Sequence, residues 1–149
     1  MDRQPVAYIF RLTFPIVPPP TTLFTPFYRH FSAAVATEGS RQKFVSNILN
    51  AYNRFSLDGI DIDWEYPGQQ GNAGNAVSSS DTANFFLFLQ LLRRTLPPSA
   101  KITAATQTVP FAGSDGRPLQ DVVEFAKVLD WVLLMNYDVW GCTISFFSG

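Results

Sequence analysis

Large apolar residues recur along the middle of the chain at two alternating periods. In 41–55 they return every three or four residues, the spacing of one face of an α-helix. Residues 59–66 instead alternate apolar and acidic positions, the period of a strand with two different faces. The helical spacing returns in 82–94, with Asp81 as the expected N-cap. Four residues of this second helix should face the core: Phe85, Phe88, Leu89 and Leu92.

The alternation continues toward the C-terminus. Residues 101–108 fit a strand, 119–127 a short helix and 131–137 a strongly apolar strand. Strands that alternate with helices predict an α/β domain with parallel strands and right-handed crossovers. Parallel strands are usually covered on both faces, which fits the strongly apolar composition of residues 131–135.

The two ends of the chain differ from this pattern. Residues 1–29 hold six of the 11 prolines, three of them consecutive. Consecutive prolines favour extended polyproline backbone, so only a short strand within 6–14 is expected there. Residues 142–149 do not continue the pattern. The chain therefore divides into an atypical Pro-rich segment (1–29), an α/β domain (30–141) and an unrelated tail (142–149).

Composition narrows the possible functions. The chain has 149 residues, enough for one domain but short of the ~250 of a complete eight-stranded α/β barrel. Its net charge is -1 and it has no basic run, which argues against a nucleic-acid partner. No apolar run reaches the ~18 residues of a membrane-spanning helix, so no membrane partner is expected.

Cysteine and histidine are each present once, as Cys142 and His30. One cysteine cannot form an internal disulfide, and a single histidine argues against a histidine-based metal site or a Ser-His-Asp triad. At the N-terminus, Asp2, Arg11 and Pro15 interrupt the apolar residues, so the segment is not typical of a signal peptide.

Three acids mark the strand predicted at 59–66. Asp61, Asp63 and Glu65 lie two residues apart, so their side chains should share one face. Like charges along one face repel and are costly to bury. Such a row is typical of acid–base chemistry with separated pKa values, or of a metal site. The opposite face carries Ile60, Ile62 and Trp64, which we interpret as packing residues.

Residues 58–67, Asp-Gly-Ile-Asp-Ile-Asp-Trp-Glu-Tyr-Pro, resemble the signature strand of glycoside hydrolase family 18, the chitinases. Two further segments are similar to that family: Phe31-Ser32-Ala33-Ala34 followed by Arg41 and Phe44, and Met135-Asn136-Tyr137-Asp138. The resemblance spans about residues 29–141. It implies a partial (β/α)8 TIM barrel of α/β class, truncated at both ends, in which 30–141 is a partial catalytic domain with barrel strands four to six.

Two segments depart from the family pattern. Members carry Ser-x-Gly-Gly on the third barrel strand, where this chain has 23–28, Leu-Phe-Thr-Pro-Phe-Tyr. The match also ends after Gly141, without the remaining strands or the tryptophan that floors the sugar site. We therefore expect this truncated chain to be inactive and poorly soluble by itself. Residues 131–135 would lie at an unpaired edge of the sheet, and the inward face of acids would be open to solvent.

The resemblance also implies a role for each acid. Glu65 would be the general acid that protonates the glycosidic oxygen. Asp63 would hold the 2-acetamido group of the substrate, whose oxygen attacks the anomeric carbon. Asp61 would support Asp63 by sharing a proton with it.

Substrate-binding residues are implied as well. Tyr137 would hydrogen-bond the acetamido group, Asp138 would contact the sugar, and Met135 would pack the pocket wall. Core packing is the alternative for Met135 and Tyr137. Gln107 and Phe111 could line the cleft or merely pack in a loop.

The expected function is a chitinase that cleaves β-1,4-linked N-acetylglucosamine polymers with retention of configuration. Two alternatives stay open: a non-catalytic chitin-binding relative, and an endo-β-N-acetylglucosaminidase acting on N-glycans. Chitin or a chito-oligosaccharide would be the partner, with no metal, cofactor or obligate protein partner. The family resemblance implies an extracellular location.

Overall fold

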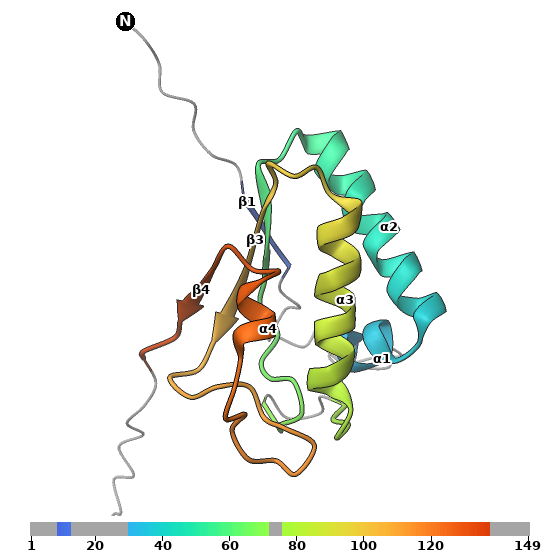
Figure 1. Cartoon of the computed structure of the whole chain (residues 1–149). Coiled ribbons are helices and arrows are strands. Elements are labelled where there is room, and N and C mark those ends of the chain that lie inside the picture. The colour runs from blue at the N-terminus through green and yellow to red at the C-terminus, as the bar shows by residue number, and fades with distance from the viewer. Residues whose placement is uncertain (1–8, 13–29, 72–75, 138–149) are drawn as a thin grey trace, which may run out of the picture.

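A computed structural model describes residues 9–12, 30–71 and 76–137. Their elements run β1 (Ile9–Leu12), α1 (His30–Ala36), α2 (Glu38–Phe55), β2 (Gly59–Ile62), α3 (Asp81–Thr95), β3 (Lys101–Thr106), α4 (Val123–Ala126) and β4 (Trp131–Leu134). The strands form one parallel sheet in the order β1-β2-β3-β4, with α1, α2 and α3 packed together on one side (Figure 1). The predicted α/β class with parallel strands is confirmed.

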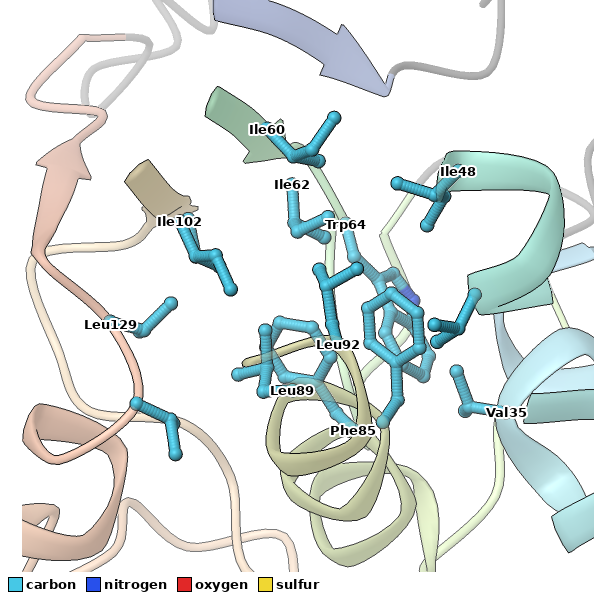
Figure 2. Packing of buried hydrophobic residues seen from close by; sticks show 14 of the residues in the cluster. Val35, Ile48, Ile60, Ile62, Trp64, Phe85, Leu89, Leu92, Ile102 and Leu129 are labelled. Atoms are coloured by element: carbon cyan, nitrogen blue, oxygen red, sulfur yellow. The ribbon is translucent and has the colours of Figure 1, made fainter. Parts of the chain in front are cut away.

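The core lies between the sheet and α3 (Figure 2). All four residues predicted to face inward from α3 are buried, so that prediction is confirmed. They meet Ile60, Ile62 and Ile102, each 0% exposed. Trp64 is also buried and stacks on Phe31 with ring centroids 5.2 Å apart, as expected of a packing residue.

Helix α2 begins earlier than predicted because of its cap. Thr37 and Ser40 form a reciprocal capping box, so the helix starts at Glu38. At the other end Ser56 adopts the left-handed conformation, with φ 49°, and turns the chain toward β2. Phe55, the last residue of the apolar spacing in 41–55, lies at this turn and is exposed, so the spacing does not predict burial at this end of the helix.

Asp81 is not the N-cap of α3; that position belongs to Ser80. Asp81 is the first helical residue and is buried. Its carboxylate accepts a 2.6 Å hydrogen bond from the Ser32 hydroxyl and a 2.8 Å bond from the Ser78 amide. The acid thus joins α1 and the preceding loop to α3, because a buried carboxylate needs such donors.

The second half of the chain has shorter elements than predicted. β3 ends at Thr106 and β4 at Leu134. The helix predicted at 119–127 is limited to α4. The Leu119 amide donates a hydrogen bond to the Phe111 carbonyl, so Leu119 belongs to the preceding loop. Asp121 Oδ1 then accepts from the Val123 amide, where α4 begins.

β4 is an edge strand in the described sheet. Its four residues are 37% to 61% exposed, as expected for an unpaired edge and unlike a parallel strand covered on both faces. β4 pairs only with β3 in the part of the chain that the structure describes. At the other edge, β1 pairs with β2, which confirms the short strand expected within 6–14 and makes β2 an inner strand.

Arg93 fixes the start of β4. Its guanidinium donates to the carbonyls of Val128 and Ala100 and to Asp130 Oδ2 at 2.5 Å. Asp130 also accepts from the Ile102 amide at 2.9 Å and forms an ion pair with Lys101. These contacts connect α3, β3 and the residue that precedes β4.

None of the described helices is both long and apolar enough to cross a membrane.

Candidate active site

The three acids lie where β2 leaves the sheet. The strand predicted at 59–66 pairs only over β2, so Asp61 is in the strand while Asp63 and Glu65 follow it. Asp61 is 3% exposed, and the other two are half-buried. The expectation of an open acid face was therefore wrong for Asp61. Asp63 and Glu65 lie at the carboxyl end of a parallel strand, the end that carries active sites in α/β folds.

Asp61 is held by the neighbouring strand. The Thr103 hydroxyl of β3 donates a 2.6 Å hydrogen bond to Asp61 Oδ1, and Thr103 is 1% exposed. The two residues are register partners in the sheet. A hydrogen bond to a carboxylate away from water is among the stronger ones in proteins. Thr103 was not predicted as a site residue, since its partner is set by strand register.

Glu65 is linked to Tyr66 and Gln107. The Tyr66 hydroxyl hydrogen-bonds with both side chains, and the Glu65–Tyr66 peptide bond is cis. Burial and the negative charge of Glu65 raise the pKa of Tyr66, against the opposing effect of the Gln107 hydrogen bond. Tyr66 thus stays protonated and can donate to the Glu65 carboxylate. The Trp-Glu-Tyr-Pro motif was the only sequence signal for Tyr66, and no role was assigned to it.

Met135 and Tyr137 extend β4 toward these residues. The Met135 amide donates to the Thr106 carbonyl at 2.8 Å, one residue beyond β4. Trp131 is the register partner of Thr103, so alternation places Met135 and Tyr137 on the Asp61 side of the sheet. Met135 is half-buried and Tyr137 is 62% exposed, while its phenol adds to the raised pKa of Tyr66. Asp138 lies outside the described residues.

Gln107 and Phe111, which follow β3, have different contacts. Gln107 contacts Tyr66 and therefore belongs to the site. Phe111 packs on Phe125, with centroids 4.7 Å apart, and on Phe85 at 5.7 Å, which makes it a core residue.

A cavity of about 450 Å³ opens near the same ends of β3 and β4. Its lining is mostly apolar and includes Val109, Phe125, Leu129 and Val132, without any of the three acids. The cavity therefore lies apart from the acid row, although Gln107 borders both.

No group of three or more His, Cys, Asp or Glu side chains within the described residues is arranged to hold a metal ion. The acids instead form a row with separate partners: Thr103 for Asp61, and Tyr66 for Glu65. Asp61 is thus held by the neighbouring strand, and Glu65 by the residue that follows it.

The family model for glycosyl hydrolases family 18 matches residues 25–144. The chain is 41% identical over 113 residues to a chitinase-like effector of Moniliophthora roreri. It is 43% identical over 114 residues to a chitinase-like effector of Moniliophthora perniciosa. These matches cover 76% and 75% of this chain but only 27% and 26% of the relatives, so the chain spans about a quarter of their length.

Solved structures agree with these sequence matches. The chitinase RmChi1 of Rhizomucor miehei superposes with a TM-score of 0.73 at 33% identity, covering 76% of this chain and 31% of that one. The Group IV chitinase of Ostrinia furnacalis, solved with allosamidin, gives a TM-score of 0.63 at 27% identity, covering 76% and 29%.

Proposed function

The chain belongs to glycoside hydrolase family 18, and from that premise we propose that it carries the acid row of a chitinase. In this proposal the described sheet is part of a (β/α)8 barrel, with β2, β3 and β4 as barrel strands four, five and six. Parallel strands joined in sequence order, with helices on one side, support this correspondence. The substrate would be a β-1,4-linked polymer or oligomer of N-acetylglucosamine.

In the proposed mechanism, Glu65 donates its proton to the glycosidic oxygen as the bond to the anomeric carbon breaks. Asp63 orients the 2-acetamido group, and the acetamido oxygen forms a new bond to that carbon. The resulting oxazolinium ion is opened by water, which gives a proton to Glu65. Two displacements at one carbon retain its configuration, the substrate-assisted route by which family 18 departs from two-carboxylate glycosidases.

One observation carries this proposal. Asp63 and Glu65 stand together, half-buried, beyond the carboxyl end of an inner parallel strand. There the acids can reach a ligand while their backbone is held by the sheet. Tyr137 and Met135 lie on the same side of the sheet and are the proposed sugar contacts, together with Asp138.

A chimera tests the hydrolase proposal. Residues 30–137 of this chain would replace the matching segment of the Rhizomucor miehei chitinase, giving the acids a complete barrel. We expect turnover of an N-acetylglucosamine oligomer, and a loss of about 10²–10⁴-fold or more in the Glu65→Gln variant. A folded chimera that turns over no substrate with Glu65 intact would contradict the proposal.

Chitin binding without hydrolysis is the second candidate. The two relatives named chitinase-like effectors favour it, at 41% and 43% identity. Retention of both Asp63 and Glu65 favours the hydrolase. The chimera separates the two, because a binding protein would retain the oligomer and release no product.

We also infer that the chain acts outside the cell, where such polymers are exposed. A relative from Penicillium expansum, 32% identical over 103 residues, is named secreted chitinase LysM12, which supports this location.

A further inference from the structure

One face of β3 presents polar side chains to the acid row. Thr103 is the register partner of Asp61. Alternation along the strand places Ala105 and Gln107 on the same face, two and four residues further on. Thr103 and Gln107 therefore meet the acid row near its first and last members, with the small, buried Ala105 between them.

The hydroxyl of Thr103 has a defined direction. In its 2.6 Å contact the hydroxyl is the donor and Asp61 Oδ1 the acceptor. Thr103 is β-branched and 1% exposed, which restricts its rotamers. A fixed donor to Oδ1 fixes the plane of the Asp61 carboxylate and thereby the direction of Oδ2.

Gln107 reaches the acid row through a second residue. Gln107 and Tyr66 line the same small cavity beside the end of β3, and their side chains are hydrogen-bonded. The Tyr66 hydroxyl also hydrogen-bonds with Glu65. Tyr66 therefore connects Gln107 to the last acid of the row.

We propose that Thr103 and Gln107 are positioning residues of the acid row, Thr103 acting through Asp61 and Gln107 acting through Tyr66 on Glu65. The expected effect on sugar binding rests on the proposed function, whereas the contacts themselves can be tested without a sugar. Neither residue needs to touch the substrate, so their loss should change the geometry of the acids while leaving the sugar-contacting side chains in place.

Matched substitutions in the 149-residue chain test the first contact. Thr103→Val keeps the shape and removes the hydroxyl, whereas Thr103→Ser keeps the hydroxyl. Thr106→Val makes the same change on the opposite face of β3, at a residue 8% exposed. Binding of an N-acetylglucosamine hexamer would be measured by calorimetry, with folding checked by circular dichroism. We expect binding about tenfold weaker in Thr103→Val, and within about threefold of wild type in the other two.

The second contact has a spectroscopic readout. In protein with ¹³C-labelled tyrosine, the ring carbon that bears the hydroxyl reports each phenol during a pH titration. One late-titrating signal should vanish in Tyr66→Phe. In Gln107→Leu it should move to still higher pH, because the hydrogen bond that lowers the pKa of Tyr66 is lost. A Gln107→Leu signal at its wild-type position would overturn the Gln107 part.

The outcomes distinguish the inference from the proposed function. Equal hexamer binding by wild type and Thr103→Val overturns the role of Thr103 while leaving chitin recognition intact. Equal losses in Thr103→Val and Thr106→Val overturn it too, because they indicate general destabilisation of β3. A wild-type chain that binds no hexamer contradicts the expectation that the two residues affect sugar binding. The tyrosine titration then still decides whether Gln107 contacts Tyr66.

Discussion

Replacing Asp130 by Asn should weaken the attachment of β4 to β3 at neutral pH and have little effect in acid. Burial alone raises the pKa of Asp130, but the hydrogen bond from the Ile102 amide and those from Arg93 and Lys101 outweigh burial. Together they lower the pKa from its usual 3.8 to about 2. The residue lies immediately before β4, so its loss acts on the strand that leads to Met135.

The magnitude follows from the pKa difference. A shift from 3.8 to about 2 corresponds to at most about 2.4 kcal/mol of stability at neutral pH. The Asp130 side chain is 21% exposed, so solvent screening reduces the expected value to about 1 kcal/mol. Because the folded-state pKa lies below the unfolded one, this stability is fully present above the unfolded pKa of 3.8. It is lost as the pH falls through about 2.

Urea unfolding of wild type and Asp130→Asn at a series of pH values from ~6 to ~2 measures this directly. The difference in unfolding free energy should be about 1 kcal/mol at the upper end and close to zero at the lower. Glu124→Gln is a control, since the ion pair of Glu124 with Lys127 is largely exposed and should contribute little at any pH. A cost of Asp130→Asn that is the same at every pH would refute the reasoning.

Three further predictions concern the site and the core. In the chimera, Asp63→Asn should lower turnover strongly for substrates with a 2-acetamido group on the reacting sugar, and equal loss on a substrate without that group would contradict its assigned role. The 149-residue chain alone should release no product from a chitin oligomer in a mass-spectrometric assay, because a four-stranded sheet offers fewer sugar contacts, and so less binding energy for distortion, than a full barrel. Ready turnover would show that less of a barrel suffices. Phe85→Ala should cost about 4 kcal/mol in urea unfolding, since the ring is 1% exposed and contacts Trp64 and Phe111, and a cost under about 1 kcal/mol would contradict this packing.

Sequence patterns predicted the core well because helical periodicity reports burial directly. The inward face of α3 and the packing role of Trp64 followed from spacing alone. The C-terminal end of β2 did not, because an alternating pattern continues through Glu65 while the hydrogen-bonded ladder stops at Ile62. Strand alternation describes side-chain direction and carries no information on where pairing ends.

The hydrogen-bond partners of the acids could not be predicted from the sequence either. The contact of Thr103 with Asp61 depends on the register between β2 and β3, which are 42 residues apart at this point. Likewise, exposure of β4 depends on which strands lie beside it, and its apolar composition alone indicated the opposite. Local pattern predicted the elements from α2 to β4 but not α1, whereas contacts between distant elements required the assembled sheet.

Gly71 shows how far the acid row depends on residues outside it. A Cβ atom added at Gly71 would overlap the backbone carbonyl of Glu65, so any other residue there must displace the chain that carries the acid. In a saturation mutagenesis screen scored by activity, Gly71 would therefore group with Glu65 among the intolerant positions, although it has no side chain to offer a sugar. A designer who grafts the acid row onto another scaffold must also transfer Gly71 and the loop residues that place it against Glu65.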